Sequence, residues 1–222
     1  MYFDKIMQAL NDFDAIETAA ADAWKEAQKK LHEDYGNTGR VFVDEFAKGK
    51  ELYEKTVAEA KQKGKAIVEE EFERINNIVR EFVTAPVPSE FPSTLEAIKT
   101  AGKGLTKAEI EAYTEKYKKN YIAYVALTAA ISAATGQNFY FKRYDAIKNE
   151  IEDYSDLVMK IFDQYGKNSY MRALMLSDKH TPLHSLDETL QKFLQEDVAA
   201  FKDPEQEAME EGIAAGLATL NK

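Results

Sequence analysis

The chain has 222 residues, room for one large domain or two small ones, and its 45% hydrophobic content argues against wholesale disorder. It has no cysteine, which excludes disulfides, thiolate metal sites and a cysteine nucleophile. The net charge of −10 disfavours nucleic acid, and with no membrane-length apolar run and no secretory signal we expect a cytoplasmic protein or a particle assembled there.

The first predicted helix runs from about Asp4 to Asp34, where apolar residues keep helical spacing throughout. Residues 35–39 then end it, because Gly36, Asn37 and Gly39 accept the left-handed backbone conformations that a helix stop requires. The sequence therefore predicts a tight turn after one long helix.

The second predicted helix, Val41 to Thr84, has no proline and a single helical register. At 1.5 Å per residue it would be roughly 66 Å long, beyond the roughly 45 Å diameter of a compact globule of this chain length. Two long helices joined by a short loop favour an antiparallel hairpin over residues 1–84. We expect an elongated all-α protein with little catalytic contribution from this part.

Small residues at Gly49, Ala60 and Gly64 interrupt the apolar seam of the second helix. They allow close approach of the first helix, at a propensity cost of roughly 1 kcal/mol per glycine. The alternative is that the helix bends at these glycines. The unbroken register favours close packing.

The clearest boundary is the proline-rich linker at residues 85–93, because three prolines within seven residues keep the chain extended. Residues 94–222 then form a predicted helical bundle with an acidic C-terminal segment. From Asp187 onward, nine acids and three lysines leave a charge of −6, whereas residues 99–148 carry nine bases and four acids, or +5.

Capping signals place the helices of this bundle. Ser93 with Glu96 predicts a short helix ending near Gly102, and Thr106 with Glu109 predicts a helix of about 29 residues ending at Gly136. Further helices are predicted over Lys142–Gln164, from Ser185, which forms a capping box with Glu188, and from Pro204. A short segment around Tyr170–Leu176 lies between the first two of these. The stretch Asn138–Phe141 has strand-like residues but is too short and isolated to predict a strand.

Two of these helices carry tyrosine-rich seams. Tyrosine needs a partner for its hydroxyl and is enriched where a surface meets another chain, so we expect these seams to pack on one another or on a second copy. The second seam has the 3-4 spacing of coiled-coil packing. The candidate interaction residues are Ile110, Tyr113, Tyr117, Tyr121 and Tyr124, continuing through Thr128 and Ile131, and then Tyr144, Ile147, Ile151, Tyr154, Val158, Ile161 and Tyr165.

Signals for catalysis or metal binding are weak. His32 suits the end of the first helix, where a cation complements the helix dipole. His180 and His184 are four residues apart, but Pro182 lies between them and no third ligand has a recognisable spacing. Phosphate-binding, zinc-protease, di-iron and nucleophile-elbow motifs are absent. We therefore predict no enzyme, no cofactor, no metal and no small-molecule substrate.

The best candidate for nucleic-acid contact is the basic and aromatic stretch Lys116–Tyr121, where tyrosines could stack on bases while lysines neutralise phosphates. The competing interpretation is an ordinary amphipathic helix, with tyrosines on the seam and lysines such as Lys118 on the opposite face. We favour the second interpretation.

One stretch of about 45 residues contains Thr84-Ala85-Pro86, Leu95-Glu96-Ala97-Ile98, Leu105-Thr106-Lys107-Ala108-Glu109 and Asn120–Leu127. It resembles a module in small helical proteins from bacteriophage structural gene regions. This chain departs from that pattern by a much longer C-terminal portion. The resemblance implies a virion or assembly role and transfers no functional residue.

These observations favour a non-enzymatic structural protein that forms a homo-oligomer and docks partner proteins, in a bacteriophage particle or in the cytoplasm. The alternative is a cytoplasmic regulatory module that binds a protein through an acidic helical surface. The two differ in assembly, since a structural protein forms a large symmetric oligomer and a regulatory module captures one partner as a monomer.

Overall fold

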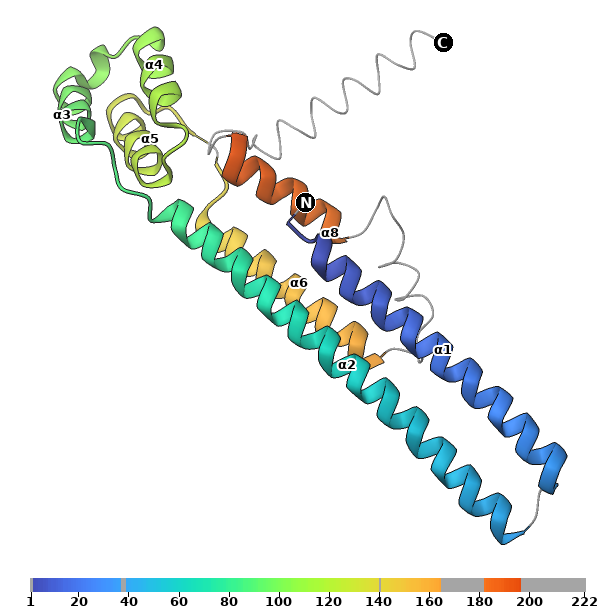
Figure 1. The fold of residues 1–222 in the computed structure, drawn as a ribbon. Coiled ribbons are helices and arrows are strands. Elements are labelled where there is room, and N and C mark those ends of the chain that lie inside the picture. The colour runs from blue at the N-terminus through green and yellow to red at the C-terminus, as the bar shows by residue number, and fades with distance from the viewer. Residues whose placement is uncertain (1, 37–38, 140, 165–181, 197–222) are drawn as a thin grey trace, which may run out of the picture. The chain divides into compact units, whose positions relative to one another are not determined.

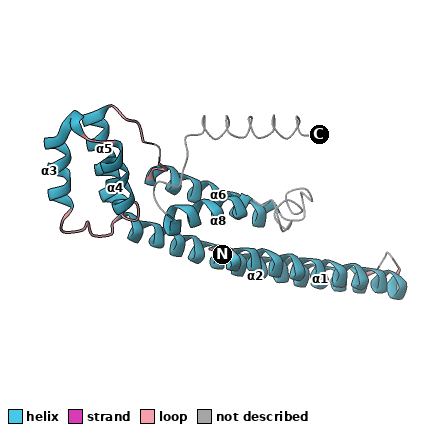
Figure 2. Cartoon of the chain, turned by 90° about the horizontal axis from the view of Figure 1, so that it is seen from above, coloured by secondary structure: helices cyan, strands magenta, loops and turns pink. Residues whose placement is uncertain are grey.

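The computed structural model describes residues 2–36, 39–139, 141–164 and 182–196. Within these residues every regular element is helical and no strand occurs, which confirms the all-α fold class (Figure 2). The segments predicted around Tyr170–Leu176 and from Pro204 lie outside the described residues, as do Tyr165 and His180.

The chain forms two compact units, each built from separate stretches of sequence. One unit combines Met1–Ile75 with Ile151–Ser185, and the other combines Asn76–Glu150 with Leu186–Lys222. The division into domains at residues 85–93 stays a prediction, because compact packing does not by itself show which parts fold alone.

The first unit is built on two long helices, α1 (Asp4–Tyr35) and α2 (Arg40–Val83) (Figure 1). Both have an apolar stripe at helical spacing, and Gly36 and Gly39, each with positive φ, form the turn between them. Three ring pairs lie within 6 Å along their length, at Phe3–Phe72, Trp24–Phe46 and His32–Phe42. Residues near the start of α1 contact residues near the end of α2, and residues near the end of α1 contact the start of α2. The predicted antiparallel packing of these helices is therefore confirmed.

Close packing against the first helix is seen at Gly49, whereas at Gly64 the close neighbour belongs to α6 (Tyr144–Gln164). A Cβ added at Gly49 would lie 3.2 and 3.3 Å from two ring carbons of Trp24 and still closer to a third. One added at Gly64 would lie 2.9 Å from Cζ of Phe162. These residues therefore leave space for aromatic rings of neighbouring helices.

This unit also includes the second half of α6. Its Phe162 ring is 5.1 Å from the Phe13 ring of α1. Beside it, Asp163 accepts hydrogen bonds from Lys61 (2.7 Å) and Lys65 (2.8 Å) of α2, and these lysines lower the pKa of Asp163 to about 2. The α6 helix is therefore fixed to α2 at the level of residues 61–65.

One buried carboxylate joins the start of α1 to α2. The Glu71 side chain accepts from Lys5 Nζ at 2.5 Å and from Arg74 Nε at 2.7 Å, and Arg74 also donates to the carbonyl of Tyr2. Because a buried charge without partners is costly, these contacts fix the position of the chain's N-terminal residues.

The second unit contains α3 (Phe91–Ala101), the short 3₁₀ turn η1 (Gly102–Gly104), α4 (Lys107–Tyr117) and α5 (Tyr121–Thr135). Their shared core consists of seven buried residues, Phe91, Ile98, Ile110, Tyr117, Ala123, Leu127 and Ile131. Val87, from the proline-rich linker, packs against this core, so part of that linker is held in place.

The single helix predicted from Thr106 to Gly136 is wrong. The Thr106–Glu109 capping box is present and begins α4, but this helix ends at Tyr117. Asn120 then has an extended backbone, and its side chain accepts a hydrogen bond from the amide of Ala123 and so begins α5. The Asn120 amide also donates to the carbonyl of Pro86 at 2.9 Å, which ties the break to the linker.

Two other predicted helix starts are displaced. The α3 helix begins at Phe91, two residues before Ser93, because Pro92 fits the first turn of a helix. The α8 helix (Pro182–Gln191) likewise begins at its proline and not at Ser185, and a π-helical turn, η2 (Lys192–Glu196), follows it. In both cases proline near the helix start prevails over a capping-box pattern within the first turns.

Candidate functional site

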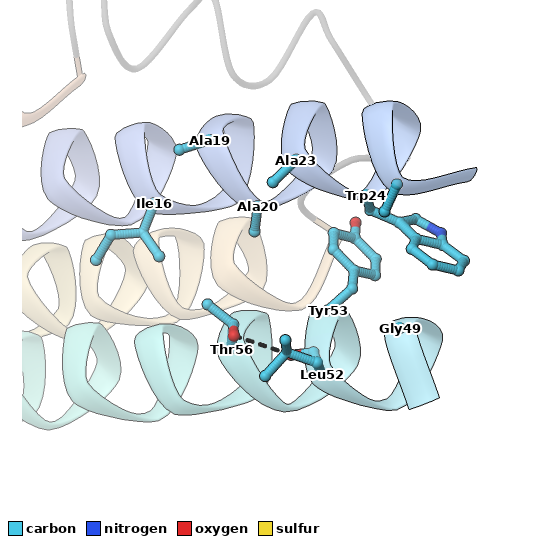
Figure 3. A pocket seen from close by; sticks show the side chains of 10 residues that line it. Ile16, Ala19, Ala20, Ala23, Trp24, Gly49, Leu52, Tyr53 and Thr56 are labelled. Carbon is cyan, nitrogen blue, oxygen red and sulfur yellow. Dashed lines mark hydrogen bonds between the residues drawn. The ribbon is translucent and has the colours of Figure 1, made fainter. Parts of the chain in front are cut away.

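The most distinctive surface of the described residues is an apolar groove between α1 and α2 in the half of the hairpin nearer the turn (Figure 3). On the α1 side it is lined by Ile16, Ala19, Ala20, Ala23, Trp24 and Ala27. Four of these six residues are alanines, so α1 has little side-chain bulk here. The result is a hollow of about 430 Å³ between helices that are otherwise in contact.

The α2 side of the groove consists of Gly49, Leu52, Tyr53 and Thr56. Thr56 donates its hydroxyl to the carbonyl of Leu52 at 2.8 Å, so no hydroxyl donor of this residue is left for the groove (Figure 3). Leu52 is 67% exposed and Ile16, opposite, is 40% exposed. Two large aliphatic side chains thus face solvent from the two walls of one apolar groove, and such surfaces are typical of protein contacts.

The groove continues along the same hairpin toward its open end. A second hollow, of about 220 Å³, is lined by residues of α1 and α2 only: Ala9, Asp12, Phe13, Ala15, Ile16, Ala60, Lys63, Gly64 and Ile67. Ile16 belongs to both hollows, so they form one surface, which we call the hairpin groove. From Ala9 to Ala27 it is about 27 Å long.

The rim of the hairpin groove is charged with both signs. Asp12 and Lys63 lie at its open end, and Glu45 and Lys48 of α2 lie near the turn. Lys48 donates to Glu45 at 2.7 Å, and this hydrogen bond, followed by the attraction between the two charges, raises the pKa of Lys48. All four residues are exposed, and Lys48 and Glu45 already form an ion pair with each other.

Searches with known family models, curated proteins and solved structures gave no match to this chain. The assignment of a site therefore rests on the geometry alone.

The first tyrosine seam is divided between α4 and α5. Ile110, Tyr117, Tyr124, Thr128 and Ile131 are buried, whereas Tyr113 and Tyr121 are half-buried. The hydroxyls find partners within the second unit: that of Tyr117 lies 2.8 Å from Thr94 Oγ1, and that of Tyr121 accepts from the Tyr144 amide at 2.8 Å. In this unit the seam serves internal packing.

The second seam lies along α6. Ile147, Ile151, Val158 and Ile161 are buried, and Tyr144 and Tyr154 are half-buried. A hydrogen bond from the backbone amide of Tyr144, in the second seam, to the hydroxyl of Tyr121 joins it to the first seam. Ile151, Val158 and Ile161 belong to the first unit and the first seam to the second. A role of either seam in binding another chain stays a prediction.

The basic and aromatic stretch near Tyr117 offers little to a nucleic acid. The Tyr117 side chain is only 1% exposed and packs edge-on against Phe91, so its ring has no free face for a base. Lys116 lies 5.1 Å from the centre of the same ring and 3.5 Å from Glu90, and Lys118 pairs with Glu115 at 2.8 Å. These lysines are paired with residues of the protein itself.

The remaining candidates for chemistry gain no support from the described residues. His32 packs against Phe42 at the turn end of the hairpin. Among the residues that the structure describes, no group of three or more His, Cys, Asp or Glu side chains could hold a metal ion. Within the same residues, no helix has the length and apolar character needed to span a bilayer.

Sequence patterns identified only part of the hairpin groove. Ile16, Ala20, Ala27, Gly49 and Tyr53 belong to the predicted apolar spacing, but that spacing omits Leu52, Ala19 and Thr56. Leu52 could have been identified as an apolar residue beside the seam of α2, facing a run of alanines on α1.

Proposed function

We propose that this chain is a non-enzymatic assembly protein that oligomerises and docks partner proteins through the hairpin groove. The observation that carries the proposal is the exposure of two large aliphatic side chains, Leu52 and Ile16, from the two walls of the groove. A helix laid into an apolar groove between two helices is a recurrent mode of protein recognition.

The length and apolar lining of the groove favour a macromolecular partner. The residues that line the groove extend over about 27 Å of α1, and its walls offer alanines, aliphatic side chains and few polar groups to fix a small ligand. An extended apolar strip with charges at its rim fits the apolar face of another helix, whose flanking residues pair with that rim.

The biological setting is proposed from the sequence. Residues 84–127 resemble a module of bacteriophage structural proteins, and a virion or its assembly intermediate is a setting in which a docking protein without an enzymatic site has a role. We place the protein there, or in the cytoplasm where such particles assemble.

Site-specific photo-crosslinking tests the docking role. A photoreactive phenylalanine analogue at Leu52 should give discrete crosslinked protein species in producing cells. The same analogue at Val43 is the control, because Val43 is also on α2 and 59% exposed but lies nine residues, or half a helical rotation, away. Equal crosslinking at both positions, or none at Leu52, would contradict the proposed function.

A further inference from the structure

Of the described residues, only those of α1 and α2 line the hairpin groove, and charged side chains lie along it. Residues of α1 and α2 that lie at one level have numbers that add to about 75, as in the contacts Phe3–Phe72, His32–Phe42 and Trp24–Gly49. By this register Asp12 is level with Lys63, a pair that also lines one hollow. The register therefore assigns a level to every charge on the rim.

Two further levels follow from the same register. An α-helix turns by about 100° per residue, which places Glu26 and Lys30 on the groove side of α1. The same rotation places Lys48 and Glu45 on the groove side of α2. Glu26 is level with Lys48, and Lys30 is level with Glu45. At these three levels the charges on the two helices are opposite. Glu59, on the same side of α2, is level with Ile16 and has no opposite charge on α1 at its level.

We propose that a second copy of this chain occupies the groove, related by a two-fold axis parallel to the hairpin. The inference rests on the proposed docking function and names its partner. Rotation about this axis lays α1 of one copy on α2 of the other without changing the level of any residue. Asp12 then faces Lys63 of the second copy, Glu26 faces its Lys48, and Lys30 faces its Glu45.

This arrangement uses one self-complementary patch, as a two-fold dimer requires. Two helices about 10 Å wide over about 27 Å give roughly 540 Å² per copy, or about 1,100 Å² in total, which exceeds the roughly 1,000 Å² expected of a biological interface and lies among the weak, reversible ones. The alanines and Gly49 allow close approach, and Leu52 and Ile16 of each copy would be covered.

The α6 helix leaves this face open. Its Asp163 is bound to Lys61 and Lys65, which lie about 160° around α2 from Lys63 on the groove rim. The chain's own acidic C-terminal segment is a poorer occupant, because its charge of −6 over residues 187–222 does not match a rim of alternating sign.

Charge reversal followed by mixing tests the two-copy arrangement. One full-length variant carries Asp12→Lys and Glu26→Lys, and the other carries Lys48→Glu and Lys63→Glu. Alone, each should have a dimer Kd raised at least about 30-fold, because four exposed ion pairs of about 0.5 kcal/mol each are lost and the like-charge contacts that replace them add repulsion. An equimolar mixture should restore dimers in analytical ultracentrifugation, because in the mixed dimer every one of these contacts again joins opposite charges.

The mixture separates pairing between copies from pairing across the groove within one copy. Within each variant chain the reversed residue still meets a like charge, so only contacts between copies can restore the dimer. Failure of the mixture to associate, or a monomeric wild-type chain at the highest concentration reached, would overturn the two-copy inference. If Leu52 then crosslinked to a different protein, the docking function would still be supported. If Leu52 gave no crosslinks either, both the docking function and the two-copy inference would be contradicted.

Discussion

Alanine at Gly64 should destabilise the protein although it improves the helix. Gly64 lies in the interior of α2, where alanine is favoured over glycine by about 1 kcal/mol. The added Cβ would lie 2.9 Å from Cζ of Phe162, a buried ring that packs against Phe13. Overpacking of this kind costs about 1–3 kcal/mol, so we expect a net loss of up to about 2 kcal/mol.

Gly49→Ala provides the matched comparison. It makes the same change in the same helix, but the ring that it meets, Trp24, is half-exposed and can shift toward solvent. The helix-propensity gain should then remain, and this variant should be as stable as the wild type or more stable.

Urea unfolding of the two variants measures the difference, with the double variant Gly64→Ala, Phe162→Leu as a further arm. If the collision with Phe162 causes the loss, the double variant should be less destabilised than the sum of its single changes. Equal stability of Gly64→Ala and Gly49→Ala, or strict additivity in the double variant, would refute the reasoning.

Three further predictions concern other parts of the chain. The two lysines of α2 lower the pKa of Asp163 to about 2, below its value in the unfolded chain. The ion pairs of Asp163 therefore stabilise the fold above about pH 4, and this stabilisation is lost as the pH falls through about 2. Asp163→Asn should flatten the pH dependence of urea unfolding between these pH values. Asn120→Ala should cost about 1–2 kcal/mol, and Asn120→Asp less, because aspartate keeps the α5 cap and loses only the bond to Pro86; thermal melts that rank them otherwise would contradict the capping role. Ile151→Asp should unfold the chain or cost several kcal/mol, because it places an unpaired charge at a fully buried position of α6, and an unchanged circular-dichroism melt would show that the position is not core.

The sequence was sufficient for the helices that have long, regular apolar spacing. The α1 and α2 helices were predicted to within about two residues at each end, since many equivalent positions support each register. The close approach at Gly49 and Gly64 was predictable for the same reason. No pattern, however, identifies Phe162 as the ring that meets Gly64, since these residues are distant in the chain.

The errors arise where one side chain determines local structure. Asn120 divides an otherwise continuous helical pattern because its side chain caps α5 and also binds Pro86, a contact across 34 residues. The groove was missed for a related reason. Whether Leu52 is exposed depends on how much bulk α1 places opposite it, and an alanine run that satisfies helical spacing leaves that space empty.

Single-cysteine labelling tests the central claim, that a protein covers the hairpin groove, most directly. The chain has no cysteine of its own, so Leu52→Cys and Val43→Cys each introduce one thiol, at similarly exposed positions on opposite sides of α2. In dilute purified protein the two thiols should react with a maleimide at similar rates. In producing cells we predict that the thiol at position 52 reacts far more slowly than the thiol at 43. Equal rates in cells would contradict the account.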